Sequence, residues 1–116
     1  MRRSVIATGL NTELNDEVSV TQAVLRHNIG ALQAEMDQFA EAEDTLQAAA
    51  RLSHAVGYDA GAASAVFTLG WVYERQQNSA QAIASYLNAL HLFEWIDDPS
   101  RQTRAFNNIS LIGNGL

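Results

Sequence analysis

The spacing of apolar residues along the chain predicts a series of amphipathic helices. Apolar positions recur every three to four residues over long stretches, which matches the period of an α-helix. Alanine is frequent, the chain has one proline, and runs of β-branched residues are short, and all three features favour helix. We therefore predict five helices, at residues 19–35, 38–55, 60–76, 79–96 and 99–112, after a weaker helical segment at 3–14.

Residues that can cap a helix precede each predicted start. Asp98 followed by Pro99 is the strongest signal, because proline in the first turn loses no hydrogen bond and already has a helical φ. Asn78 with Gln81 has the spacing of a capping box. The other predicted caps are Ser19 with Gln22, Asp37, and Asp59 before a helix that starts at Ala60.

The helices repeat with an offset of 40 residues. Gly30 aligns with Gly70 and Leu52 with Leu92, and the matches between them include Ala42 with Ala82 and Ala49 with Ala89. We predict that Gly30 faces Ala42 and Gly70 faces Ala82, while Leu46 and Tyr86 fill the space beside them. The predicted division of a single domain, 1–116, is an N-terminal segment at 1–18, repeats at 19–58 and 59–98, and the first helix of an incomplete third repeat at 99–116.

These residues resemble the tetratricopeptide repeat family. The resemblance lies in Asn28-Ile29-Gly30 with Ala42, Leu46 and Ala49, and in Thr68-Leu69-Gly70 with Tyr73, Ala82, Tyr86 and Ala89. It implies an all-α fold, a right-handed α-solenoid of antiparallel helix pairs with about two and a half repeats. The usual period of the family is about 34 residues. A 40-residue period is similar to the extended variant that is common in bacterial signalling and transcription regulators and in polarity adaptors.

The resemblance also implies a binding surface, because the first helix of each pair lines the concave face of such a solenoid. The residues implied for this groove are His27, Asn28, Ala31 and Glu35, then Ser64, Phe67, Thr68, Trp71, Glu74 and Arg75, then Arg104, Asn107, Asn108 and Leu111. Phe67 and Trp71 are four residues apart, so they share one helix face and can form an aromatic platform for a partner. The alternative is that Trp71 belongs to the core.

The charge of the chain argues against polyanionic partners. The formal net charge is −6, and the seven basic residues are all arginines scattered along the chain, so neither nucleic acid nor an anionic membrane surface is an expected partner. The chain has no cysteine, no signal-peptide pattern and no apolar run long enough to cross a membrane. We therefore expect a soluble cytoplasmic protein.

No residue pattern predicts catalysis. His27, His54 and His91 lack the spacing that places two imidazoles on one helix face for a metal ion. The carboxylates cluster at helix ends and first turns, where the helix dipole favours negative charge. We expect no metal, no cofactor and no enzymatic activity.

The predicted function is therefore that of a protein–protein or peptide interaction module. The last predicted helix carries Phe106, Ile109 and Ile112, more apolar surface than a terminal helix should expose, so these residues are candidates for self-association. The alternative function is a regulatory or sensor segment of a larger signalling protein (a cyclase, a kinase or a transcription regulator) that acts through homodimerisation.

Overall fold

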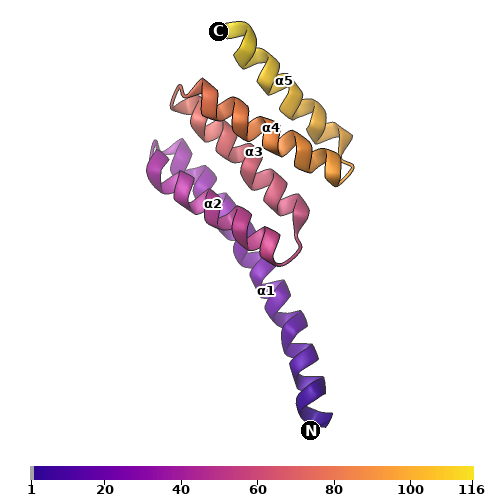
Figure 1. Ribbon diagram of the computed structural model, residues 1–116. Coiled ribbons are helices and arrows are strands. Elements are labelled where there is room, and N and C mark those ends of the chain that lie inside the picture. Colours follow the sequence, from indigo (N-terminus) through magenta and orange to yellow (C-terminus); the bar gives the residue numbers. More distant parts are fainter. Residues whose placement is uncertain (1) are drawn as a thin grey trace.

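A computed structural model describes the backbone of residues 2–116 and the side chains of residues 17–116. The chain forms five helices, α1 (Arg2–Glu35), α2 (Phe39–Ala55), α3 (Asp59–Arg75), α4 (Ser79–Trp95) and α5 (Pro99–Gly115). Each helix packs antiparallel on the next, and α1 also contacts α3. In Figure 1, α2 and α4 form the nearer layer and α1 and α3 the farther one. The fold is an all-α solenoid of helix pairs.

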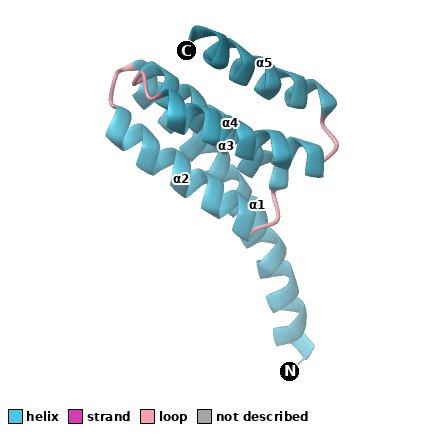
Figure 2. Cartoon of the chain, turned by 45° about the horizontal axis from the view of Figure 1, so that its top comes forward, coloured by secondary structure: helices cyan, strands magenta, loops and turns pink. Residues whose placement is uncertain are grey.

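The four connections have one shared conformation. A residue with positive φ stands in each, and these residues, Asp37, Gly57, Gln77 and Asp97, are spaced by 20 positions. In each turn the following N–H donates to the carbonyl five residues earlier, for example from Asn78 to Tyr73 at 2.9 Å. This is the Schellman arrangement, which satisfies the last carbonyls of the preceding helix. The identical turns place the loops at alternating ends of the solenoid (Figure 2).

Two of the predicted helix caps are confirmed. The Asn78 side chain accepts a hydrogen bond from the Gln81 N–H at 3.3 Å, and the Asp98 side chain accepts one from the Arg101 N–H at 3.2 Å. Pro99 occupies the first turn of α5, as the sequence predicts. Both caps satisfy backbone donors that have no partner within the helix.

The remaining cap predictions are wrong. Asp37 has a φ of 62° and ends α1, so Gln38 takes the N-cap position of α2. Tyr58 takes that position before α3, which already includes Asp59. Ser19 lies inside α1, which runs unbroken through the predicted gap at 15–18, because no proline or glycine interrupts that segment. Met1 and the side chains of 1–16 lie outside the described residues.

The core lies where the helices cross. One cluster draws on all four helices from α1 to α4 and contains Leu46, Val72 and Tyr86, which are fully buried, together with the buried alanines Ala34, Ala42 and Ala82. A second cluster joins α3, α4 and α5 around Phe93. Small residues allow the backbones to approach, and the few large side chains fill the remaining volume.

The two aligned glycines face the second helix of their pair, with Leu46 and Tyr86 beside them as predicted. A Cβ at Gly30 would lie 2.6 Å from Leu46 Cγ, and a Cβ at Gly70 would lie 2.7 Å from Tyr86 ring carbons. The carbonyl oxygen of Ala42 would lie 3.5 Å from the Cβ at Gly30. The glycines therefore leave room for a large side chain of the second helix.

Candidate functional site

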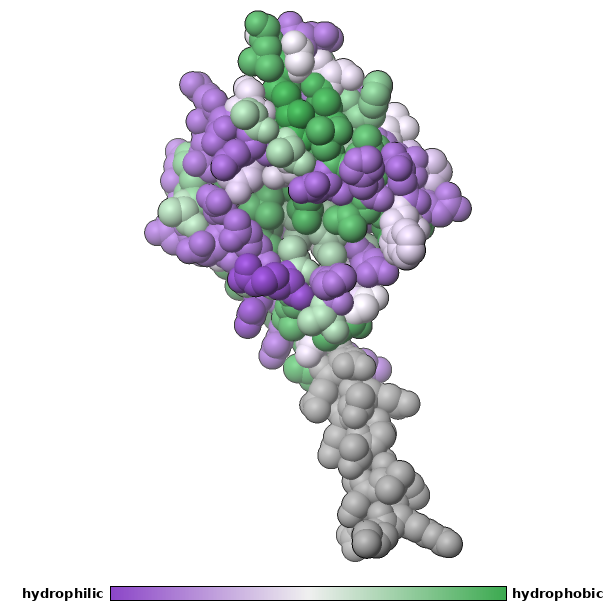
Figure 3. Space-filling model, viewed as in Figure 1, coloured by the Kyte–Doolittle hydropathy of each residue, from purple (hydrophilic) through white to green (hydrophobic). Residues whose placement is uncertain are grey.

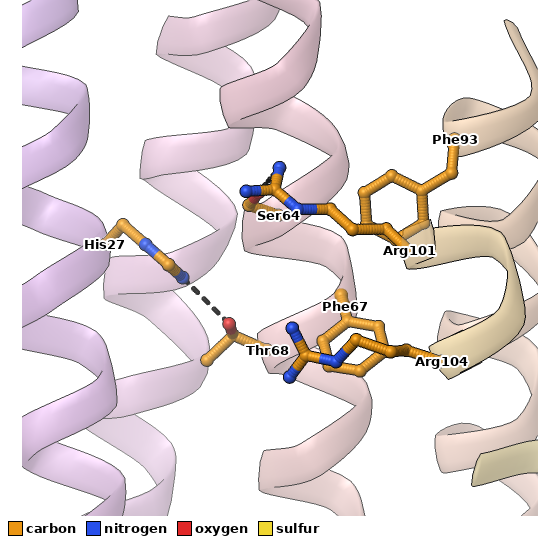
Figure 4. A pocket seen from close by; sticks show the side chains of 7 residues that line it. All are labelled: His27, Ser64, Phe67, Thr68, Phe93, Arg101 and Arg104. Atoms are coloured by element: carbon orange, nitrogen blue, oxygen red, sulfur yellow. Dashed lines mark hydrogen bonds between the residues drawn. The ribbon is translucent and has the colours of Figure 1, made fainter. Parts of the chain in front are cut away.

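Two adjoining cavities lie on the face formed by α1, α3 and α5. The first encloses about 280 Å³ and is lined by His27, Ser64, Phe67, Thr68, Phe93, Arg101 and Arg104 (Figure 4). The second encloses about 380 Å³ and is lined by Ala31, Phe67, Thr68, Trp71, Tyr86, Arg104, Asn107 and Asn108. Because they share Phe67, Thr68 and Arg104, the two form one continuous surface, which we call the groove.

Aromatic rings form the floor of the groove. The Phe67 ring centroid lies 5.1 Å from that of Tyr86 and 6.1 Å from that of Phe93, both in tilted arrangements. Such geometry is favourable for aromatic pairs. Phe67 is half-buried, so it both supports the core and presents one face to the groove.

Trp71 stands farther along α3 and is half-buried as well. The guanidinium carbon of Arg75 lies 5.2 Å from its ring centroid, and Arg75 Nη2 also donates to Asp37 at 3.2 Å. The indole is thus packed on one side and faces the second cavity on the other. Trp71 therefore packs against the core and also lines the second cavity.

One hydrogen bond joins α1 to α3 across the first cavity. His27 Nε2 and Thr68 Oγ1 are 2.7 Å apart, and Figure 4 shows this contact between the two helices. Partial burial removes water from the imidazole and lowers the pKa of His27 below its usual 6.5. His27 is therefore neutral at pH 7.

The cations of the groove come from α5. Arg101 Nη1 donates to Ser64 Oγ at 3.3 Å, and its Nε lies 3.6 Å from Asp98 Oδ2. The guanidinium carbon of Arg104 lies 5.4 Å from the Phe67 ring centroid, a cation–π contact. Figure 4 shows both side chains reaching from α5 toward α3. No Asp or Glu is among the residues that line either cavity, as far as side chains are described.

A buried hydroxyl closes the floor of the second cavity. The Tyr86 hydroxyl donates a hydrogen bond to Glu74 Oε1. Burial and then this contact raise the pKa of Tyr86 well above its ordinary value of 10. This hydrogen bond joins Glu74, near the end of α3, to the middle of α4.

Comparison with known proteins gives one assignment. The model of the tetratricopeptide repeat matches residues 21–94, which is more than half of the chain. The chain belongs to the tetratricopeptide repeat family. No curated protein and no solved structure shows a significant match to it. Tetratricopeptide repeats generally mediate protein–protein interactions, and the family is typically a non-catalytic scaffold.

The tetratricopeptide groove contains many of the residues that the resemblance implied. Those that line the two cavities are His27, Ala31, Ser64, Phe67, Thr68, Trp71, Arg104, Asn107 and Asn108. Asn28, Glu35 and Leu111 are exposed but line neither cavity, and Glu74 and Arg75 touch it only through Tyr86 and Trp71. The surface is therefore centred on α3 and the first half of α5.

Sequence reasoning missed three lining residues. Tyr86 and Phe93 belong to the second helix of a pair, which the family pattern does not assign to the groove. Arg101 was missed although it lies three residues before Arg104, a spacing that places both on one helix face. That spacing was the available signal.

The residues predicted for self-association have different environments. Ile109 and Ile112 are half-buried and pack against the chain's own core, whereas Phe106 is 60% exposed. Figure 3 shows hydrophobic side chains gathered in the upper part of the molecule, where α4 and α5 lie. More exposed apolar side chains are on α1, including Leu25, Ile29 and Leu32, and Met36 follows directly after this helix.

The described part of the chain contains neither a group of metal-ligand side chains nor a membrane-spanning helix. No three His, Cys, Asp or Glu side chains within it are grouped as a metal ion would require. No helix in the same residues is long and apolar enough to cross a bilayer. His54 and His91 are exposed on α2 and α4, away from the groove.

Proposed function

We propose that this chain is a non-catalytic module that binds a protein or peptide segment in the groove of α1, α3 and α5. The observation that carries the proposal is the continuity of the two cavities, which present aromatic faces, side-chain amides and arginines on one surface. Aromatic and arginine side chains in partly desolvated pockets are the groups that contribute most to protein interfaces. The general role of tetratricopeptide repeats supports the same function.

The chemistry of the groove favours binding over catalysis. Thr68 and His27 form its one hydroxyl–imidazole pair within the described residues, and no carboxylate lines the cavity to orient the imidazole. A nucleophile of this type normally requires a base that is itself held by a third group. Asn107 and Asn108 offer both donors and acceptors, as recognition of a peptide backbone requires.

A substitution that fills the groove tests the proposal better than one that empties it. Phe67 contacts two core rings, so removing it would confound binding with folding. Ala31 lines the second cavity, and Ala31→Tyr would occupy that space. Ala84→Tyr, at an exposed position on α4, is the matched control.

Selection from a random peptide library displayed on phage provides the readout. We expect the wild type and Ala84→Tyr to enrich peptides, and Ala31→Tyr to lose most of that enrichment while keeping its helical circular dichroism. Equal enrichment by all three proteins would place binding elsewhere and contradict the proposal. Failure of the wild type to enrich any peptide would contradict it as well.

The finer assignments belong to this proposal. We place the chain in the extended 40-residue variant of the family, with repeats at 19–58 and 59–98 and a first helix at 99–116. The constant spacing of the turns supports this division. We also propose a cytoplasmic signalling context, in which the partner is a protein rather than nucleic acid or a membrane, because the net charge is −6.

A second candidate function is homodimerisation, and the surface of α1 favours it. Leu25, Ile29 and Leu32 are 49–57% exposed, whereas their counterparts at an offset of 40, Ala65, Leu69 and Val72, are buried in the interior of the solenoid, where α2 packs on α3. The exposed residues follow the alternating three- and four-residue spacing of a helix-pairing seam. A second copy of α1 is the occupant that such a self-matching seam suits.

Light scattering on purified protein tests the second candidate. A dimer that Leu32→Glu converts to a monomer, while the exposed control Leu87→Glu does not, would support it. A monomer across the accessible concentration range would contradict it. This result is independent of peptide binding, so the two candidates can be separated.

A further inference from the structure

The charge of the groove is opposite to that of the chain. The whole protein has 13 acidic and 7 basic residues, yet the charged residues that line the two cavities are Arg101 and Arg104. His27 adds no charge of either sign at pH 7, because burial lowers its pKa below 6.5 and leaves it neutral. A local excess of positive charge on an acidic protein favours a negatively charged ligand at that place.

Arg104 has the greater capacity to bind an anion. No carboxylate lies within ion-pair distance of it among the side chains that are described, whereas Arg101 is shared with Asp98 and Ser64. The Phe67 ring holds the Arg104 guanidinium at 5.4 Å and takes none of its planar N–H donors. Those donors are arranged to bind both oxygens of one carboxylate.

An apolar cavity lies directly beside this cation. Arg104 lines both cavities, and the second one is bounded by Trp71, Tyr86 and Ala31. A volume of about 380 Å³ is enough to accept a large aliphatic or aromatic side chain. The amides of Asn107 and Asn108 lie at the same cavity and can pair with a peptide backbone.

We infer that the groove recognises a protein segment in which a carboxylate side chain neighbours a large apolar side chain. The carboxylate binds Arg104, with Arg101 at the edge of the site, and the apolar side chain enters the cavity beside Trp71. This inference rests on the proposed function, because it specifies the partner of the same groove. It specifies that the partner's charge is negative and that Arg104 contacts it.

A nucleic acid would also be negatively charged, but the groove suits it less well. Polyanion binding needs several cations spread along a surface, and the net charge of −6 repels a long polyanion. The cavity next to Arg104 is bounded by Trp71, Tyr86 and Ala31 and suits an apolar group. A labelled single-stranded oligonucleotide is therefore included in the test as a competing ligand.

The experiment compares peptides selected from a displayed random library by three proteins. These are the wild type, Arg104→Glu, and Arg51→Glu, which makes the same charge change at an exposed position on α2. We expect the wild type and Arg51→Glu to enrich peptides with Asp or Glu beside a large apolar residue. Arg104→Glu should lose that preference and enrich Lys or Arg at the same place.

Synthetic versions of the enriched peptides then give affinities. Arg104→Glu should weaken binding of an acidic peptide about tenfold to a hundredfold, as expected for a charge-assisted contact. Replacing the peptide's carboxylate by its amide should weaken binding to the wild type but not to Arg104→Glu, which shows that the two groups contact each other.

The outcomes separate the inference from the proposed function. Enrichment of neutral or basic peptides by the wild type, or an unchanged preference in Arg104→Glu, would overturn the inference and leave the peptide groove standing. No enrichment at all would overturn both. Oligonucleotide binding at about 150 mM salt that Arg104→Glu abolishes would overturn the inference in favour of a nucleic-acid ligand.

Discussion

His27 Nε2 and Thr68 Oγ1 share a hydrogen bond of 2.7 Å that ties the first helix of one repeat to the first helix of the next. The contact lies at the edge of the groove, in the cavity that Arg101 and Arg104 also line. It therefore links the stability of the solenoid to the shape of the groove.

This contact predicts a dependence of stability on pH. Burial lowers the pKa of His27 below 6.5, so as the pH falls the unfolded chain binds a proton before the folded one does. The contribution of neutral His27 is complete above about pH 6.5 and is lost as the pH falls through the lower pKa of the folded state. His27→Gln, which keeps a hydrogen-bonding group, should show a smaller loss of unfolding free energy toward pH 5.

Urea unfolding of both proteins between about pH 5 and 7.5 measures the effect. His54 and His91 are present in both, so the difference between the two curves reports on His27 alone. A difference that is constant with pH would contradict the prediction.

The contact between Gly70 and Tyr86 predicts a second effect. A Cβ at Gly70 would lie 2.7 Å from carbons of a ring that is fully buried and cannot move aside. Gly70→Ala should therefore lower the unfolding free energy by about 1–3 kcal/mol, the usual cost of overpacking a core.

Gly113 is the matched control for this substitution. It lies in α5 with no atom within 4 Å of an added Cβ, so Gly113→Ala should be neutral or stabilising by up to about 1 kcal/mol. Urea denaturation of both variants decides the matter. Equal effects of the two substitutions would show that Tyr86 does not require the glycine.

Local chemistry explains why some helix ends can be predicted from sequence and others cannot. Asn78 and Asp98 act as caps through hydrogen bonds to residues three positions away, which sequence spacing shows directly. Asp37 looks the same in sequence but occupies the left-handed position that ends α1. An aspartate suits both roles, and the tertiary path of the chain selects between them.

Contacts between distant residues were predicted less completely. The repeat of Gly30 at Gly70 indicated a close helix approach, and the side chains beside it, Leu46 and Tyr86, could be predicted because they repeat with the same offset of 40 residues. Many residues that line the groove could be predicted because the first helices of successive repeats lie on one face of the solenoid. Its floor was missed because Tyr86 and Phe93 reach it from the other layer.

The turns predict a third effect on stability. Gln77 has a φ of 59°, a left-handed conformation that costs a residue with a Cβ about 1 kcal/mol relative to glycine. Gln77→Gly should raise the melting temperature by about 4 °C. Gly57→Ala makes the reverse change at φ 76° in open space, and it should lower the melting temperature by a similar amount. Calorimetry that shows opposite signs supports this account, whereas a loss of stability in both variants contradicts it.

The hydrogen bond from Tyr73 to Glu43 predicts a loss of stability in alkali. The hydroxyl donates to Glu43 Oε1 at 2.8 Å, and burial together with this contact raises the pKa of Tyr73 from 10 to about 12. As the pH rises above 10, the unfolded chain loses its proton first, so the unfolding free energy falls between about pH 10 and 12. Tyr73→Phe should be less stable than the wild type at pH 8 and should show a shallower decline in this range. Parallel declines in the two proteins would contradict the assignment.

Fluorescence of Trp71 tests the binding groove most directly. Trp95 is 80% exposed, so Trp95→Phe leaves Trp71, which lines the second cavity, as the single indole reporter. We predict that a library-selected acidic peptide shifts the Trp71 emission to shorter wavelength as its apolar side chain excludes water, and that Arg104→Glu weakens this response about tenfold or more. Saturable peptide binding with no change in Trp71 emission would contradict the proposed groove.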